Sequence, residues 1–289
     1  DCSTFCAEHG STALAKGTIS GVDLDRALGH LLRVQFRLGL FDSLEEQVYT
    51  RYGLEKVNSE EHQMLALEAA RQGMVLLKNE NGVLPLSVSV EVEKEGGNEE
   101  EGMEEEGDAV LKMALLRRER ERHLRRGQRG GPSPPLSLAV IGPHANATEA
   151  LLGNYQGDPP FIISPIEGLR KYVSDAVLVE GCGINSTLAG DQMSAAEAAA
   201  QAADVTILVL GLDSSIEGEG LDRTSIVLPA PQMELAARVL EAAAKGEKKA
   251  VVVLIAGGAV EVGFLKEDER VAAMVFAGYP GKKQVCVLA

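Results

Sequence analysis

Short, uninterrupted apolar runs that alternate with helical segments constrain the fold of this chain more than any other sequence feature. The runs are aliphatic and rich in β-branched residues, and most of them end directly before a glycine. They occupy residues 138–141, 176–179, 205–210, 251–256 and 272–277. Strands that are apolar on both faces are typical of buried, mostly parallel sheets. The sequence therefore predicts the α/β class, with an open, mostly parallel sheet sandwiched by helices.

Two helices are predicted between the later runs. Residues 194–203 begin with Ser194 and carry Glu197 three positions later, which is the spacing of a capping box. Residues 231–244 begin with Pro231, a residue favoured in the first turn of a helix. Each helix would connect one strand to the next, as parallel pairing requires.

The first part of the chain is expected to be helical. Ser20 and Asp23 give a capping-box start, and Gly39 ends the helical periodicity that follows. A second helix is predicted to begin near Ser59, with an apolar stripe that extends to Leu77.

Residues 88–135 differ from the rest of the chain in composition. Glu-rich sequence is followed by Arg-rich sequence and then by a Gly- and Pro-rich end. Few of these residues could enter a core, so the segment is interpreted as a charged low-complexity insert that is disordered.

The predicted strand at 205–210 is followed by a loop that gathers most of the candidate chemistry. In open parallel sheets, ligands bind beyond the carboxyl ends of the strands. Residues 212–223 read LDSSIEGEGLDR and hold the carboxylates of Asp213, Glu217, Glu219 and Asp222, together with Arg223.

This loop resembles that of glycoside hydrolase family 3, and most closely its plant-type β-xylosidase / α-L-arabinofuranosidase branch. The family run Glu-Gly-x-Asp-Arg is present from Glu219 to Arg223. Further segments resemble the family in the family's own order: Asp1-Cys2 with Phe5, 33–42 (RVQFRLGLFD), 67–73 (LEAARQG), 140–146 (VIGPHAN), 153–155 (GNY) and 277–281 (AGYPG).

The resemblance implies a domain organisation. Such enzymes pair a (β/α)8-like barrel, which carries a nucleophilic Asp, with an α/β sandwich, which carries an acid/base Glu. Residues 1–55 would be the end of the barrel domain plus a linker. Residues 56–87 and 136–289 would form the sandwich, interrupted by the insert at 88–135.

The resemblance also implies roles for the loop residues. Glu219 fits the acid/base position, with Glu217 as the second choice. Asp222 and Arg223 are interpreted as a pair that shapes the loop, with substrate binding as the alternative, because an Arg can clamp a carboxylate with two hydrogen bonds. Asp213 is interpreted as structural.

Composition and spacing exclude several other functions. The net charge of −15 disfavours nucleic-acid binding, and no apolar run reaches the ~18 residues of a membrane span. The glycine spacing at 142–146 is not that of a phosphate loop, and His144 has no partner spaced for metal binding, so no cofactor and no metal are expected. The four cysteines include no C-x-x-C pair.

The substrate implied is a β-xyloside or related oligosaccharide, hydrolysed with retention. No residue of this sequence matches the family's nucleophile, so this chain alone is expected to show little or no turnover. A non-catalytic carbohydrate-binding or interaction module on the same fold remains an alternative, and an unrelated nucleotide-binding protein is a weaker one. No signal peptide is visible and no protein partner is assigned; the family resemblance alone implies an extracellular or cell-wall location.

Overall fold

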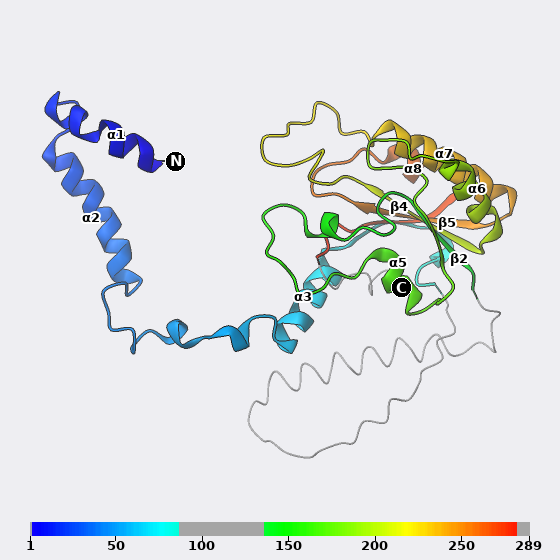
Figure 1. The fold of residues 1–289 in the computed structure, drawn as a ribbon, viewed down its shortest axis with the longest axis horizontal. Helices are drawn as coiled ribbons and strands as arrows, with labels where there is room; N and C mark the ends of the chain where they lie inside the picture. Colours follow the sequence, from blue (N-terminus) through cyan, green and yellow to red (C-terminus); the bar gives the residue numbers. More distant parts are fainter. Residues whose placement is uncertain (1, 87–135, 282–289) are drawn as a thin grey trace, which may run out of the picture. The chain divides into compact units, whose positions relative to one another are not determined.

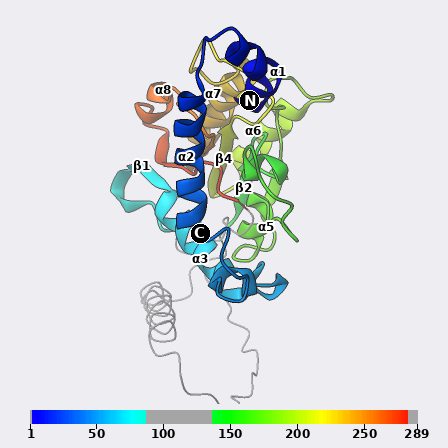
Figure 2. The same ribbon diagram turned by 90° about the vertical axis from the view of Figure 1, so that its left-hand side faces the viewer.

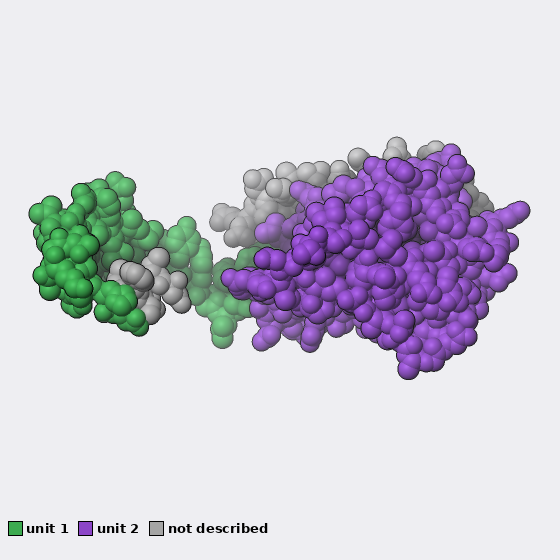
Figure 3. All heavy atoms as spheres, turned by 90° about the horizontal axis from the view of Figure 1, so that it is seen from above, with its two compact units in different colours: residues 1–62 green, residues 63–289 purple. Residues whose placement is uncertain are grey.

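The fold was obtained as a computed structural model that describes residues 2–86 and 136–281. It divides into two compact units, Asp1–His62 and Gln63–Ala289, shown in different colours in Figure 3. The insert predicted at 88–135 lies outside the described residues.

The first unit is helical, as predicted. It contains α1 (Cys2–Ala15), α2 (Gly21–Arg37) and two short 3-10 helices, Val48–Arg51 and Leu54–Lys56. The capping box at the start of α2 is confirmed: the Ser20 side chain accepts from the Asp23 amide, and the Asp23 carboxylate accepts from the Ser20 amide at 3.0 Å.

The second unit is built on a six-stranded sheet with the order β1-β6-β5-β4-β2-β3. The strands are β1 (Val75–Asn79), β2 (Leu138–Ile141), β3 (Val177–Val179), β4 (Val205–Gly211), β5 (Lys249–Ile255) and β6 (Val271–Phe276). All neighbours pair in parallel except β1, which runs antiparallel to β6 at the edge. The predicted fold class and the five predicted strands are confirmed.

The strand β1 corrects one sequence prediction. The helix that begins near Ser59 is α3 (Glu60–Gly73), and it ends before Leu77, which lies in β1. The apolar spacing fits a helix, but β1 gains backbone hydrogen bonds along the edge of β6, in which Leu76 pairs with Val275. Tertiary pairing of this kind overrides local periodicity.

Helices cover both faces of the sheet. Figures 1 and 2 show α6 (Gln192–Ala202), α7 (Ala230–Lys245) and α8 (Gly263–Lys266) over one face and α5 (Pro165–Arg170) over the other.

Of the two helix starts predicted between the later strands, one is confirmed and one is wrong. The α7 start near Pro231 is confirmed, but the capping box proposed at Ser194 and Glu197 is wrong. Asp191 caps α6 by accepting from the Ser194 amide, and Glu197 pairs with Arg238 of α7 instead. The helix begins two residues earlier than predicted, so Ser194 lies inside its first turn.

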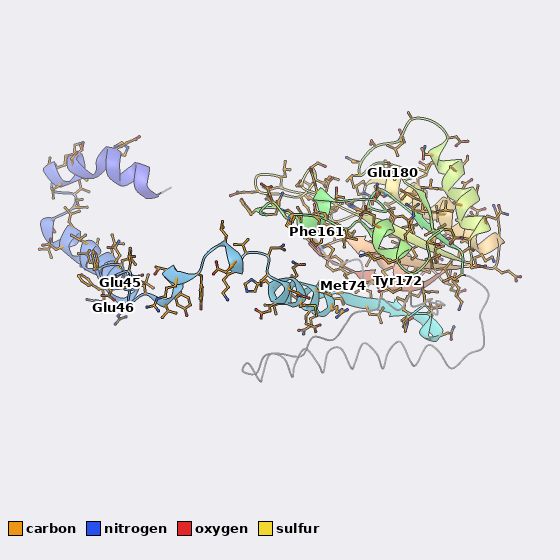
Figure 4. The ribbon with its side chains drawn as sticks, turned by 60° about the horizontal axis from the view of Figure 1, so that its bottom comes forward. Glu45, Glu46, Met74, Phe161, Tyr172 and Glu180 are labelled. Carbon is orange, nitrogen blue, oxygen red and sulfur yellow. The ribbon has the colours of Figure 1, made fainter. Side chains whose placement is uncertain are left out.

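Two apolar clusters fill the space between the sheet and its helices. Side chains alternate across the sheet, so Leu208 and Leu210 of β4 join the cluster under α6 and α7, while Val209 joins the cluster on the α5 face. Met74 and Tyr172, which are labelled in Figure 4, pack against the second cluster. Because helices cover both faces of the sheet, side chains that must contact water or a ligand are expected at the edges of the sheet.

Gly211 tests how tightly this sheet packs at the end of β4. A Cβ on Gly211 would lie 1.8 Å from the Ile255 carbonyl oxygen, and its φ of +147° disfavours any side chain. We expect Gly211→Ala to lower the free energy of unfolding by about 3 kcal/mol or more. Gly190 is the matched control, since its φ is +78° but no atom lies within 4 Å of its Cβ position. Gly190→Ala should cost only about 1 kcal/mol in urea denaturation, and equal costs would contradict the clash.

Candidate active site

The candidate loop begins where the parallel strands β4, β5 and β6 end side by side. In this part of the sheet Gly211 pairs with Ile255, and Leu254 pairs with Phe276. The segments that follow these strands, 212–223, 257–259 and 277–281, therefore leave the same edge of the sheet. This is the edge at which parallel sheets bind their ligands.

A buried glutamine fixes the base of the loop. Gln232, in the first turn of α7, is fully buried and accepts a hydrogen bond from the Gly211 amide at 2.8 Å. Its Nε2 donates to the carbonyl oxygens of Gly211 and Ile184, both at 2.7 Å. The Leu212 amide donates to the Ile255 carbonyl at 2.8 Å, which also joins the loop to β5. Sequence reasoning missed Gln232, because a lone glutamine in a helix carries no signal of burial.

The first turn of the loop is organised by Asp213. Its carboxylate accepts from the Ser215 amide at 2.9 Å and from the Ser215 hydroxyl at 2.5 Å. Its carbonyl accepts from the amides of Ile216 and Glu217. Asp213 is thus a structural residue, as the sequence suggested.

The Glu217 carboxylate lies at the centre of a converging set of donors. Oε1 accepts from the Gly257 amide at 2.6 Å and from the Tyr279 hydroxyl at 2.6 Å, and Oε2 accepts from the Gly258 amide at 3.1 Å. Nη1 of Arg223 lies 3.9 Å from Oε2. Only 13% of the Glu217 side chain is exposed, so these contacts replace water.

Positions 257 and 258 must be glycine for the Glu217 carboxylate and the Tyr279 ring to come this close to the backbone. A Cβ on Gly258 would lie 2.8 Å from Oε2 of Glu217, and a Cβ on Gly257 would lie 2.7 Å from the Tyr279 ring. Burial, together with the hydrogen bond to Glu217, raises the pKa of the Tyr279 hydroxyl, which therefore keeps its proton and acts as the donor.

Arg223 closes the loop against the same segment. Its guanidinium donates to the Ala259 carbonyl and faces Glu217, and it forms no ion pair with Asp222 in the part of the chain that the structure describes. Asp222 is exposed. A loop-shaping Arg223 fits the geometry, but the carboxylate that it faces is Glu217.

The turn that carries Glu219 projects from this framework. Gly218 and Leu221 form an isolated bridge, with a 3.1 Å hydrogen bond from the Leu221 amide to the Gly218 carbonyl. Glu219 and Gly220 occupy the tip, where Gly220 has a φ of +80°. Glu219 is exposed.

Comparison with known proteins assigns this fold and loop to a family. Residues 132–289 match the family described as the glycosyl hydrolase family 3 C-terminal domain. The chain belongs to glycoside hydrolase family 3. It is 37% identical over 282 residues to Beta-D-xylosidase 1 of Arabidopsis thaliana, covering 98% of this chain and 30% of that protein. Exo-1,4-beta-xylosidase xlnD of Aspergillus niger is 32% identical over 285 residues, again with 98% and 30% coverage.

Solved structures agree. A GH3 exo-beta-xylosidase, XlnD, in complex with a xylobiose aziridine activity-based probe superimposes with a TM-score of 0.70 at 30% identity, over 97% of this chain and 30% of that one. A beta-glucosidase from Listeria innocua, at 22% identity and a TM-score of 0.69, shares the fold. This family 3 chain therefore spans about 30% of the length of the relatives it matches.

The structure thus separates the predicted site residues of this family 3 chain. It brings Glu217 and Arg223 together in a bonded network and leaves Glu219 and Asp222 exposed on the turn between them. Sequence reasoning assigned no role to Tyr279, Gly257 and Gly258, although Tyr279 lies in a segment that resembles the family and both glycines follow the predicted strand at 251–256.

The described residues show no site of another kind. Among them, no three His, Cys, Asp or Glu side chains gather as metal ligands, and no helix is long and apolar enough to cross a membrane. Cys182 is buried, and burial raises the pKa of its thiol to about 11.

His144 lies beneath the site loop as a fully buried, neutral imidazole. Burial lowers its pKa to about 4, against the opposing effects of the Asp213 carboxylate and the Leu212 carbonyl. Since the unfolded chain binds a proton near the ordinary value of 6.5, the stability tied to neutral His144 is complete above that pH and is lost as the pH falls toward 4.

This predicts a specific pH dependence. Between pH 6.5 and about 4, titration of His144 should lower the free energy of unfolding by up to about 1.4 kcal/mol per pH unit. His144→Leu should flatten this slope in urea denaturation followed by circular dichroism, whereas the exposed control His30→Gln should keep it. An unchanged slope in His144→Leu would contradict the assignment.

Proposed function

We propose that this chain supplies the general acid and base, Glu219, of an enzyme that hydrolyses β-xylosides, such as xylan-derived oligosaccharides, by a retaining mechanism. The observation that carries this proposal is the contrast between the two glutamates of the loop. Within the described residues the Glu219 carboxylate has no hydrogen-bond or ion-pair partner and is exposed at the carboxyl edge of the sheet, whereas Glu217 is fully engaged.

An acid/base group must be free to exchange protons with the substrate. Both oxygens of Glu217 already accept hydrogen bonds, from Gly257, Gly258 and Tyr279. Turning the Glu217 carboxyl group toward a glycosidic oxygen would break these hydrogen bonds. Glu219 can reach a bound sugar without losing any internal contact.

The proposed reaction has two steps. In the first, Glu219 donates its proton to the leaving oxygen while a second carboxylate bonds to the anomeric carbon and the glycosidic bond breaks. In the second, Glu219 takes a proton from water, whose oxygen attacks the anomeric carbon and releases the second carboxylate. Retaining enzymes hold the two carboxyl groups about 5–5.5 Å apart. We assign no residue of this sequence to the second carboxylate, which in the family comes from the barrel domain.

The substrate class rests on the relatives. Several of the similar relatives are named as β-xylosidases, and one, from Medicago sativa, is named as a β-xylosidase/α-L-arabinofuranosidase. Xylosides are therefore proposed first, then arabinosides and β-glucosides. An extracellular or cell-wall location belongs to the same proposal, since xylan is a cell-wall polysaccharide.

The acid/base assignment predicts a dependence on the leaving group. In a chimera in which this chain replaces the matching 282 residues of Arabidopsis Beta-D-xylosidase 1, Glu219→Gln should lower kcat/KM for xylobiose by about 10²–10⁴-fold. The loss should be much smaller for the first step with dinitrophenyl β-xyloside, whose leaving group needs no proton. Added azide should then yield β-xylosyl azide.

The control is Glu234→Gln, which removes an exposed carboxylate on α7 and should leave both substrates unaffected. Equal losses for xylobiose and the dinitrophenyl xyloside, with no azide product, would show that Glu219 is not the acid/base.

A second prediction concerns the 289-residue chain by itself. Because we assign only one of the two required carboxyl groups to it, purified chain should hydrolyse nitrophenyl β-xyloside no faster than buffer. Arabidopsis Beta-D-xylosidase 1 serves as the positive control. Turnover that disappears in Glu219→Gln would support the acid/base assignment but refute the claim that the second carboxylate is missing.

A further inference from the structure

We infer that Glu217 is a positioning residue whose carboxylate fills an anion-binding cradle at the ends of β5 and β6 and thereby fixes the turn that presents Glu219. The inference deepens the proposed function and depends on it for the role of Glu219. The cradle itself can be tested without any catalytic assay.

The cradle is formed by donors that belong to three separate segments. Consecutive amides of Gly257 and Gly258 follow β5, the Tyr279 hydroxyl follows β6, and the Arg223 guanidinium comes from the far end of the site loop. Successive backbone amides make a concave site for anions, and hydrogen bonds to an ionised acceptor are stronger than neutral ones. Three hydrogen-bond donors and a guanidinium charge 3.9 Å away favour a carboxylate over a neutral amide.

The walls of the cradle are set by close packing. The Tyr279 ring lies against Gly257 on one side and Gly153 on the other, where a Cβ would approach it to 2.7 Å and 2.8 Å. The strand end that leads to Gly257 is buried at Ile255 and Ala256. Because this packing holds the Tyr279 ring and the Gly257 backbone, we expect these donors to keep their positions when the carboxylate is removed.

The same short segment holds the Glu219 turn at both of its ends. Glu217, directly before the turn, accepts from the amides of Gly257 and Gly258. Arg223, directly after it, donates to the Ala259 carbonyl.

Between these two anchors, the described hydrogen bonds of residues 218–222 consist of the single Leu221-to-Gly218 contact. The turn has little order of its own, so residues 257–259 decide where Glu219 points.

The test uses isotope-labelled, full-length chain and nuclear magnetic resonance. In the wild type we expect the Gly257 amide proton far downfield, because its hydrogen bond to a carboxylate is only 2.6 Å long. Glu217→Ala should remove that shift and drop the order parameters of residues 218–222 below ~0.6, the range of flexible backbone. The strand amides of β4 and β5 should keep their positions, which shows that the fold is intact.

Rescue of the Glu217→Ala variant with an added carboxylate tests whether residues 257 and 258 bind an anion or whether Glu217 only fills space. Added formate should restore the Gly257 shift in Glu217→Ala but not the order of 218–222, because a free anion fills the cradle without tying it to the loop. In the matched variant Glu219→Ala, formate should change nothing. Tyr279→Phe, which keeps the ring and removes one donor, gives a milder second variant in which the Gly257 shift persists and formate is not needed.

The outcomes separate this inference from the proposed function. It is overturned if residues 218–222 stay as ordered in Glu217→Ala as in the wild type, or if formate leaves the Gly257 amide unchanged. If Glu217→Ala loses the Gly257 shift and formate restores it, while Glu219→Gln shows no leaving-group dependence in the chimera, the cradle is confirmed and the acid/base assignment is wrong.

Discussion

Burial of a parallel sheet on both faces is the constraint on which the rest of the second unit depends. The central strands β4 and β5 are apolar on both sides except for the buried Thr206 and the exposed Lys249, and they are closed by α6 and α7 on one face and α5 on the other. No hydrated polar group fits within such layers. Polar chemistry is therefore confined to the edge where β4, β5 and β6 end together, and the loop after Gly211 lies at that edge.

The site contains two glutamates, separated by one glycine, that differ in their surroundings. Glu217 accepts hydrogen bonds from two backbone amides and a tyrosine and faces an arginine, so its geometry is fixed. Glu219 lacks such partners in the described structure and is exposed, as its proposed acid/base role requires. A flexible, glycine-containing turn can place a carboxyl group accurately only if neighbouring residues are anchored, and Glu217 and Arg223 supply those anchors.

Gln232 and His144 support this arrangement from below. Gln232 satisfies both backbone groups of Gly211, which would otherwise be unpaired at the end of a buried strand. His144 is held neutral beneath Asp213, so its environment ties the stability of the domain to pH without a role in proton transfer. Neither residue touches the exposed turn, yet both act on the segment from which it rises.

The sequence by itself determined the α/β class, the five parallel strands, the capped helix after Ser20 and the loop that carries the chemistry, because hydrophobic periodicity and capping are local properties. The sequence prediction wrongly placed Leu77 in a helix and the cap of α6 at Ser194. Both errors arise because the pairing of β1 with β6 and the Glu197–Arg238 contact join residues that are far apart in the chain.

The sequence alone also could not decide which of Glu217 and Glu219 is held in place, because both lie in the same loop with similar neighbours. Only the tertiary structure decided which of them is held, since the donors that bind Glu217 come from Gly257, Gly258 and Tyr279, about 40 and 62 residues away in the sequence.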